Sequence, residues 1–560
     1  MRNNWKKKLS WAILASAPII LSACGGEDAA VEAPRNADGD IIMTIGQQTQ
    51  PNSKLPEGDT YSNNAYRRLV KAELGVELES AFEATGDEYT RQISLAMASG
   101  DIPDLMVVSR DELEELVDND LIADLSDIYD EYASDNIKDI YNSFDGVQLD
   151  AATIDGRLMA LPGTANDFGP NLVWIRQDWV DKLNIELDQD GNKALTLDEL
   201  KDTVKAFKEE DPGNTGKSIG TALAYWLSSE NHGGSGFTAN PILNAFGAYP
   251  KNYLTDDKGQ VYYGSNTPEM KQALEYLKGW FDEGLLDPQF GTRTYDDINA
   301  MMVNGELGII PGPWHISDWA LVQAKTSNPE VQFVPYAIEN ANGDGKVNGI
   351  AKPGTGSFVV VRKGFEKPEV AVEMINLIFD EVPNSEDMEN EFPEIYEYAQ
   401  KAVDGSVRPV NIELFKNLSE IADAVEATKG ANGEISIADI TSFTVRNNAS
   451  KMKKYLDNPA EADPTDWAVY ASRLLAVDGV MNTLRENNTL NEITPPVIFE
   501  KIESSERNGA QIAKLEEETM IKFITGAESL DNFDKYVETW NKQGGAEIIQ
   551  ERQEILDGRE

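Results

Sequence analysis

Cysteine and histidine are scarce in this sequence. Its 560 residues include one cysteine, Cys24, and two histidines, His232 and His315. A chain with a single cysteine cannot form an internal disulfide, so its fold must rest on packing alone. No HExxH string is present, and no cysteine beyond Cys24 is left to bind zinc. The G-x-S-x-G elbow and the Walker phosphate loop are also absent, so the common motifs of esterases and nucleotide hydrolases are missing.

Positive charge is the second shortage. The chain has 49 lysines and arginines against 97 aspartates and glutamates, which gives a formal net charge of −48. A surface this acidic repels nucleic acid and anionic lipid head groups, so neither is an expected partner. Hydrophobic residues make up 41% and aromatic residues 8% of the sequence, which is enough for large cores. Because the chain exceeds the size of one core, we expect at least two domains.

The one long apolar stretch that we single out stands at the amino terminus. Residues 1–23 begin with basic side chains and continue with an apolar run from Leu9 to Leu21, broken by small and polar residues. This is the layout of a secretory signal peptide, and the run is too short and too interrupted for a spanning helix.

The end of this leader carries a second signal. The stretch Leu21-Ser22-Ala23-Cys24 resembles a bacterial lipobox. The resemblance implies cleavage before Cys24 and lipidation of that residue, which would anchor the chain to the extracytoplasmic face of the cell membrane. An ordinary signal peptide with an incidental cysteine is the alternative. Residues 24–38 are small and acidic, and we interpret them as the tether of the lipid anchor.

Strand and helix patterns alternate after the tether. Short β-rich runs cover residues 41–45, 76–82 and 102–108, and helical patterns cover residues 61–74 and 87–99. This alternation predicts a parallel sheet covered by helices, so the fold class is α/β.

Similar signals recur along the rest of the chain. In chain order they are a strand and helix in residues 171–185, a helix capped by Thr196 and Glu199, a helix opening at Thr267-Pro268, strands in 305–313 and 357–361, a helix in 368–380, and a helix from Ser529 to a stop at Gly544-Gly545. Residues 381–510 carry weaker signals, and we interpret them as mostly helical and as crossing between domains.

The string LAMASGDIPDLMV at residues 95–107 resembles the signature of the bacterial extracellular solute-binding proteins of family 1, the oligosaccharide-binding subunits of ABC importers. Further strings look similar to the longer lipoprotein branch of that family, which is found on Gram-positive cells. They are IDGRLMALP (154–162), NLVWIRQDWVDKL (171–183), TLDELKDTVKAFKEEDPGNTGK (196–217), NAFGAYP (244–250), FDEGLLDPQF (281–290), GELGIIPGPWHI (305–316) and KLEEETMIKFITGAESLDNFDKYVETWNKQGG (514–545). The strings follow the family order over nearly the whole chain, so together they are specific.

The resemblance implies a type II periplasmic-binding-protein fold, in which two α/β lobes close on a ligand in the cleft between them. Lobe one would hold residues 39–165 and a return segment near residues 335–385. Lobe two would hold residues 166–334 and much of residues 386–560, with a helical carboxyl-terminal part.

The resemblance also implies a function. The chain would be a substrate-binding lipoprotein that captures an oligosaccharide by hinge closure and delivers it to the transmembrane subunits of an ABC permease. Ligands of this branch include uronic oligosaccharides. The protein would perform no reaction and need no cofactor, and we expect a monomer. Two alternatives stay open: a surface glycoside hydrolase or lyase, because 97 acidic residues leave room for a carboxylate pair, and a sensor lipoprotein without a permease.

A sugar site needs exposed aromatic rings with hydrogen-bonding groups at its rim. Trp314 follows a predicted strand within a glycine–proline turn, and the resemblance places an aromatic residue of the cleft at this position. Tyr225 and Trp226 follow the strand-like run 219–224, where the clefts of α/β proteins form. We therefore predict that these three rings contact the ligand. Helical patterns place other tryptophans in the core, namely Trp280, Trp467 and Trp540.

Polar ligand contacts are predicted as well. Gln47, Gln48 and Thr49 follow the first strand and would donate hydrogen bonds from lobe one. Arg176 is a further candidate, although its string also fits a structural strand. An acidic sugar would be held by arginines through paired hydrogen bonds to its carboxylate. The candidates for that role are Arg176, Arg293 and Arg408.

Two strings resemble calcium loops. The first has EF-hand spacing at Asp188, Asp190, Asn192, Thr196 and Glu199. Lys193 occupies the position that needs glycine, and Asp190-Gly191 also fits a β-hairpin turn, so we favour the hairpin over calcium. The second string, residues 211–217, resembles the calcium loop of the family's alginate-oligosaccharide receptors. It lacks several oxygen ligands of that loop, and we favour a plain turn.

Overall fold

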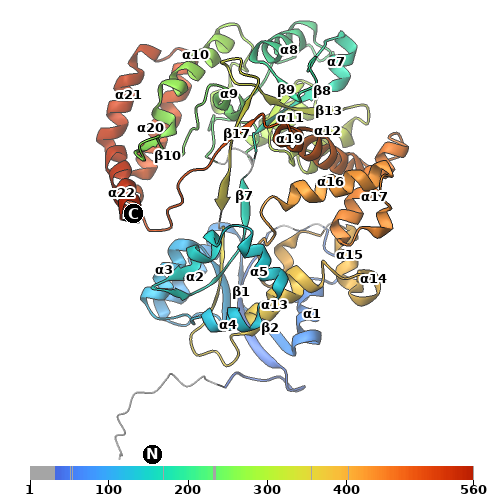
Figure 1. The fold of residues 1–560 in the computed structure, drawn as a ribbon, viewed down its shortest axis with the longest axis vertical. Helices are drawn as coiled ribbons and strands as arrows, with labels where there is room; N and C mark the ends of the chain where they lie inside the picture. The colour runs from blue at the N-terminus through green and yellow to red at the C-terminus, as the bar shows by residue number, and fades with distance from the viewer. Residues whose placement is uncertain are drawn as a thin grey trace, which may run out of the picture.

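The protein consists of two α/β lobes, one above the other in the computed structural model (Figure 1). The structure describes residues 32–50, 52, 54–167, 169–230, 235–354, 356–401 and 403–558. The expected signal peptide, Cys24 and His232 lie outside these residues. Every helix in the described ranges is too short or too polar to serve as a membrane span.

Lobe one is built on a five-stranded sheet in the order β2-β1-β3-β16-β6. The strands are β1 Ile41–Gln48, β2 Val76–Ala84, β3 Leu105–Val108, β6 Leu161–Pro162 and β16 Phe358–Val361. β1 pairs in parallel with β2 and β3, whereas β16 runs antiparallel to β3 and β6. The predicted parallel α/β arrangement is confirmed. β3 and β16 are buried along their whole length, which explains why their sequences are apolar without alternation.

Helices pack around this sheet. They are α1 Ala65–Leu74, α2 Gly86–Ser99, α3 Arg110–Asp118, α4 Ser126–Tyr132, α5 Asp135–Asn142, α6 Val147–Ala152, α13 Val370–Asn376, α14 Met388–Glu391 and α15 Pro393–Lys401. α1 begins where the Asn64 side chain accepts hydrogen bonds from two backbone N–H groups, and it ends at Gly75 in the left-handed conformation with a φ of 64°.

Lobe two contains a four-stranded sheet in the order β12-β8-β13-β9. The strands are β8 Leu172–Arg176, β9 Ala194–Leu195, β12 Ile309–Gly312 and β13 Phe333–Ile338. β8 runs antiparallel to β12 and β13, and β9 pairs in parallel with β13. The β-hairpin predicted at Asp190-Gly191 is therefore wrong, because β9 pairs with a distant strand and the two residues form only a turn.

The helices of lobe two come from the middle and the end of the chain. They are α7 Gln177–Leu183, α8 Leu197–Glu210, α9 Asn240–Ala245, α10 Pro268–Asp282, α11 Tyr295–Val303, α12 Leu321–Ser327, α20 Glu503–Thr525, α21 Phe533–Trp540 and α22 Ala546–Asp557. The predicted capping box is confirmed at α8, where Thr196 and Glu199 bond to each other's backbone N–H. The predicted cap of α10 is confirmed at Thr267. Trp280, Trp467 and Trp540 are buried, as predicted.

The glycine pair after α21 does not end the helical region, contrary to the prediction. Helical turns continue from Asn541 into α22, with a kink at Gly544, whose φ is 121°. Gly545 lies against the indole of Trp540, so that a Cβ there would come within 2.0 Å of two ring carbons. Trp540 also stacks on Tyr263 with ring centroids 4.6 Å apart. The glycine pair therefore lets α22 fold back over a buried tryptophan.

A two-stranded ribbon connects the lobes (Figure 1). It consists of β7 Ala165–Asp167 and β15 Lys352–Gly354, which pair antiparallel. The expected return segment, residues 335–385, is divided by this crossing. β13 belongs to the sheet of lobe two, whereas β16 and α13 belong to the sheet and core of lobe one. Local sequence patterns can predict a strand, but they do not show which distant strand it pairs with.

Residues 381–510 are mostly helical and contribute to both lobes. Val407, Val410 and Ile412 pack in the core of lobe one. The following helices, α16 Ser419–Asn432, α17 Phe443–Asp457, α18 Pro464–Val469 and α19 Thr483–Glu486, and the π-helical segment Tyr470–Asn482 lie with lobe two. β17 Leu490–Ile493 pairs with β14 Val347–Ile350. The carbonyl of Phe499 then accepts a hydrogen bond from Arg110 of lobe one before α20 begins.

Replacing Gly545 by Ala tests the contact with Trp540. The added methyl group would overlap the indole and force one of the two helices to shift, so we expect a loss of about 1–3 kcal/mol in the free energy of unfolding. Gly509 is a matched control within α20, because a Cβ there would meet no atom within 4 Å. Gly509→Ala should be neutral or stabilise by up to about 1 kcal/mol. Equal urea midpoints for the two variants would contradict the predicted overlap.

Candidate functional site

Two strand ends beside predicted site residues lie at the crossing between the lobes, namely the end of β12 before Trp314 and the end of β1 at Gln48. β8 follows β7 directly, and its first residue, Leu172, pairs with Gly312, the last residue of β12. In lobe one, β16 follows β15, and its first residue, Phe358, pairs with Val108, the last residue of β3. Carboxyl ends of strands from both sheets therefore meet the crossing, which is where open α/β sheets bind ligands.

An aromatic group follows β12 on the side of lobe two. The indole of Trp314 meets the His315 ring edge-on, with centroids 4.9 Å apart, and His315 lies 6.3 Å from Trp319. Trp319 in turn stacks on Tyr295, with ring centroids 5.8 Å apart. Trp314 and Trp319 are half-buried, so each keeps part of its surface exposed.

A hydrogen bond fixes the orientation of two of these rings. The Trp319 indole N–H donates to Nδ1 of His315 over 3.0 Å. Burial lowers the pKa of His315 below its usual range, so the imidazole is neutral and Nδ1 can accept this bond. Gly236 lies against the Trp319 ring, where a Cβ would come within 3.1 Å of it. These contacts fix the orientations of His315 and Trp319.

Tyr225 and Trp226 lie beside this group. The Tyr225 backbone N–H donates to the carbonyl of Arg293. The rings of Tyr225 and Trp226 meet edge-on, with their centroids 4.9 Å apart. Tyr225 is 47% exposed, an unusual exposure for a large aromatic side chain. Trp314 directly follows the end of β12. Tyr225 and Trp226 lie in the loop between α8 and α9, so the strand predicted over residues 219–224 is wrong.

A cavity of about 540 Å³ adjoins the aromatic group. Its walls combine aromatic rings with polar groups, namely Trp226, Ser228, Ser229, Glu230, Ser235, Gly236, Lys251, Tyr263, Tyr295, Trp319, Ala513 and Glu516. Buried Glu516 accepts hydrogen bonds of 2.7 Å from the hydroxyls of Tyr263 and Ser265, and burial raises the pKa of its carboxyl. Apolar ring faces beside hydroxyl and carboxyl groups are the surfaces that a sugar requires.

Gln47 is buried, and its side chain belongs to the core of lobe one. It is 1% exposed, and its amide donates to the carbonyls of Ser406 and Arg408. Gln48 and Thr49 are half-buried at the end of β1, at the edge that meets the crossing. Gln48 and Thr49 are thus partly exposed at this edge, whereas the Gln47 amide is used within lobe one.

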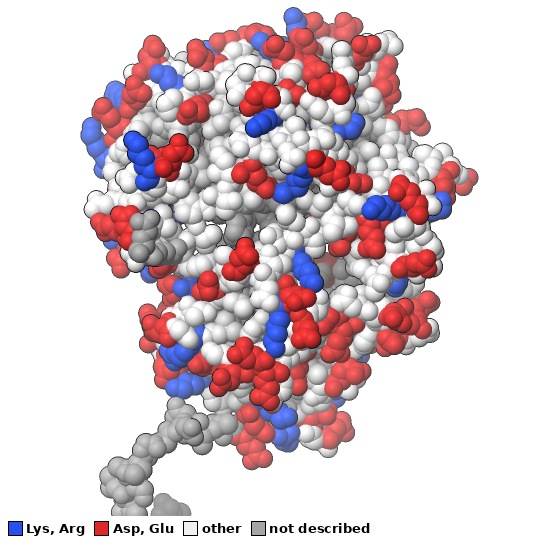
Figure 2. Space-filling view, in the orientation of Figure 1, with Lys and Arg blue, Asp and Glu red and all other residues white. Residues whose placement is uncertain are grey.

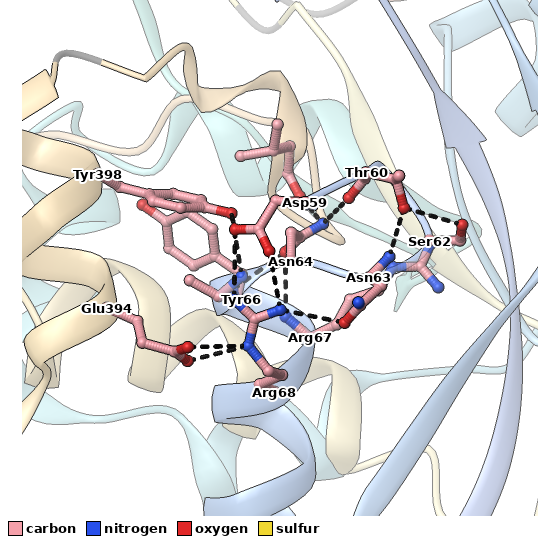
Figure 3. A network of polar contacts seen from close by, with 12 residues as sticks. Asp59, Thr60, Ser62, Asn63, Asn64, Tyr66, Arg67, Arg68, Glu394 and Tyr398 are labelled. Atoms are coloured by element: carbon pink, nitrogen blue, oxygen red, sulfur yellow. Dashed lines mark hydrogen bonds and ion pairs between the residues drawn. The ribbon is translucent and has the colours of Figure 1, made fainter. Parts of the chain in front are cut away.

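A polar network holds the segment after β1 (Figure 3). Arg68 of α1 pairs with Asp59 at 3.1 Å and with Glu394 of α15 at 3.0 Å, and the Tyr398 hydroxyl donates to Asp59. Burial would raise the pKa of Asp59, but the bonds from Arg68 and Tyr398 outweigh it and lower that pKa. The Asn64 amide donates to the carbonyl of Val407. These contacts fix the lobe-one edge of the crossing.

The three arginines considered for an acidic sugar are held by acidic side chains of the chain. Arg176 is 5% exposed, pairs with Asp178 and lies over the ring of Trp179. This placement gives Arg176 a structural role in lobe two. The other pairs are Arg293–Asp287 and Arg408–Glu413, at 2.5 and 2.8 Å.

The two calcium-like strings fold as turns in this structure. Asp188 accepts the backbone N–H of Lys193 and pairs with its ammonium group, and Asp190 accepts the backbone N–H of Asn192. Glu199 is engaged in the capping box with Thr196. Asp211 accepts the backbone N–H groups of Thr215 and Gly216, which lower its pKa. Among the described residues, no three acidic, histidine or cysteine side chains cluster as metal ligands.

Sequence analysis missed several residues of the aromatic group. Trp319 could have been found, since it follows Trp314 by five residues in the same turn-rich segment. Tyr295 and Arg473 come from distant parts of the chain, and only the fold brings them here. The guanidinium of Arg473 lies 5.2 Å from the Trp314 ring centroid and pairs with Asp318.

Comparisons with known proteins agree with this geometry. A family model described as bacterial extracellular solute-binding protein matches residues 65–388. The chain is 21% identical to the lipoprotein LipO of Bacillus subtilis, with 98% of each chain covered. It is 22% identical to the polygalacturonan/rhamnogalacturonan-binding protein YtcQ of the same organism, with 99% of each covered.

Solved structures share the fold at low sequence identity. The S. pneumoniae ABC-transporter substrate-binding protein FusA, solved with kestose, matches with a TM-score of 0.59 at 14% identity, covering 92% of this chain and 99% of FusA. The alginate-binding protein AlgQ2, solved without calcium, matches with a TM-score of 0.55 at 16% identity, covering 95% of this chain and 99% of AlgQ2.

The lowered pKa of His315 predicts a pH-dependent stability. Because the unfolded chain binds a proton on this histidine at higher pH than the folded protein does, stability should fall as pH drops below about 6.5. His315→Asn keeps a side-chain acceptor for Trp319 but does not titrate, so it should lack this part of the loss. Urea unfolding at about pH 7.5 and about pH 5 measures the difference. Equal losses in both proteins would show that His315 keeps its ordinary pKa.

Proposed function

This chain belongs to the bacterial extracellular solute-binding protein family, and from that membership we propose that it captures an oligosaccharide between its lobes and presents it to a membrane permease. Members of the family bind solutes, and we propose that this chain likewise performs no reaction on its ligand. The relatives' names span neutral and acidic carbohydrates, kestose for FusA and polygalacturonan for YtcQ. An oligosaccharide is the ligand class that these names share.

The observation that carries the proposal is the aromatic group at the crossing. Trp314 follows the end of β12, Trp319 is held by a hydrogen bond to His315, and Tyr225 and Trp226 lie in the neighbouring loop. Rings with fixed orientation lose little freedom on binding, and they offer flat apolar faces to the faces of sugar rings. The polar wall of the adjacent cavity supplies groups for the sugar hydroxyls.

The crossing supports a hinge. The ribbon of β7 and β15 is short, and it joins two lobes that each have their own core. A ligand that contacts strand ends of both lobes stabilises the closed arrangement over the open one. The permease would then recognise the closed pair of lobes as the loaded form. We expect the protein to act as a monomer.

Truncating the aromatic group tests the sugar site. We expect Trp314→Ala and Trp226→Ala each to weaken oligosaccharide binding by about 1 kcal/mol or more, roughly fivefold, through the loss of ring contacts. Isothermal titration of the soluble body against an oligosaccharide panel measures this, and the recovered sugar should be intact. Tyr132 is a matched control, since it is exposed on α4 of lobe one, away from the crossing. Unchanged affinity in both tryptophan variants, with melting temperatures preserved, would remove the group from the binding site.

We further propose that lipid on Cys24 anchors the protein. The proposal is supported by the lipobox-like residues that end at Cys24 and by the relative named as a lipoprotein. In a Gram-positive host, Cys24→Ala should abolish palmitate labelling and release the protein from the membrane fraction into the medium. Substituting Ser22 by Ala serves as the control, because it leaves the thiol in place. Membrane retention of the Cys24 variant would contradict the anchor.

A further inference from the structure

The positively charged side chains at the candidate site are already paired. Among the described residues that line the cavity or touch the aromatic group, three carry a positive charge, and a carboxylate of the chain holds each of them. The pairs are Lys251–Glu517, Arg293–Asp287 and Arg473–Asp318. A ligand carboxylate would therefore have to displace a carboxylate of the protein.

The Arg293–Asp287 pair is the hardest to displace. Asp287 is 1% exposed, and both of its oxygens accept hydrogen bonds from the Arg293 guanidinium, at 2.5 and 3.4 Å. If Arg293 turned to a ligand, it would leave a buried carboxylate without its counter-charge, which is strongly unfavourable. The Arg293 guanidinium is therefore committed to the fold, and its backbone carbonyl serves to position Tyr225.

Arg473 is closest to the predicted stacking surface. Its guanidinium lies 5.2 Å from the ring centroid of Trp314, and it contacts both Asp318 and the hydroxyl of Ser472. Asp318 keeps 29% of its side chain exposed, so the pair stands at the solvent edge of the site. A sugar carboxylate at this edge would meet the negative charge of Asp318 beside the positive charge of Arg473.

Two further carboxyl groups line the cavity. They belong to Glu230 and Glu516, and burial raises the pKa of the Glu516 carboxyl. The surrounding surface adds to this, since the chain has a formal net charge of −48 and acidic side chains are spread over both lobes on the face that Figure 2 shows. Like charges in and around a concave site disfavour an anionic ligand, most strongly at low ionic strength.

We infer that this site selects neutral oligosaccharides and discriminates against oligosaccharides that carry a uronate carboxylate. The inference rests on the proposed function and adds the charge class of the ligand. The rings of the aromatic group contact the apolar faces of a sugar, and the lining hydroxyls and carboxylates accept or donate hydrogen bonds to its hydroxyl groups. A neutral CH₂OH group at C6 satisfies these partners, whereas a carboxylate can only accept.

Pairs of oligosaccharides that differ only at C6 test the inference. Suitable pairs are α-1,4-linked galactose and galacturonate tetrasaccharides and β-1,4-linked glucose and glucuronate tetrasaccharides, with kestose and nystose as neutral references. We expect the neutral member of each binding pair to bind about tenfold tighter or more by isothermal titration, with the gap widening at low salt. Uronates that bind as tightly as their neutral partners would overturn the inference and leave the proposed function intact. Absence of binding across the whole panel would overturn the proposed function itself.

A charge variant tests the cause. Asp318→Asn removes the carboxylate that holds Arg473 and should raise uronate affinity relative to neutral affinity by about tenfold. Asp178→Asn is the matched control, because it frees Arg176, whose side chain is buried away from the aromatic group. The control should leave the ratio unchanged, and melting temperatures verify folding of both variants. An unchanged ratio in Asp318→Asn, or an equal change in both variants, would overturn the role assigned to these pairs.

Discussion

The register of two strand pairs governs the rest of this structure. Gly312 pairs with Leu172 in lobe two, and Phe358 pairs with Val108 in lobe one. Because β8 and β16 both start at the crossing ribbon, these pairings bring the ends of β12 and β3 to the crossing. A one-residue slip would turn each strand's side chains to the opposite face of its sheet. Backbone hydrogen bonds thus set where these strand ends lie, and the aromatic side chains supply the surface that would contact a ligand.

The charged side chains described above serve mainly to hold segments of the chain in place. Arg68 ties α1 to α15 through Asp59 and Glu394, and Arg176 lies against Trp179 while paired with Asp178. A chain that is rich in carboxylates can pair nearly any arginine internally. This is why an arginine near a sugar cleft is poor evidence for an acidic ligand when its partners are unknown. The same excess of carboxylates makes the surface around the site acidic.

Local signals in the sequence predicted the early α/β pattern, the helix caps at Thr196 and Thr267 and the core tryptophans, because caps and periodicity act within a few residues. The family resemblance, which the family model confirms, added the two-lobe fold. Local signals failed where distant segments meet. β9 pairs with β13, Gln47 is buried under Ser406 and Arg408, and Gly545 packs on Trp540. Trp314 was predicted from the turn that contains it, whereas no local sequence signal predicts that Tyr295 and Arg473 lie with the same aromatic group.

The position of β16 has a consequence for how the protein is made. This strand lies between β3 and β6 in the first sheet, although it follows β6 by about 195 residues and β3 by about 250 residues in the sequence. The sheet of lobe one cannot close until Val361 has been synthesised and, in an exported chain, has crossed the membrane. Until then the edges of β3 and β6 that β16 will cover stay unpaired, while residues 163–357, which include much of lobe two, are synthesised.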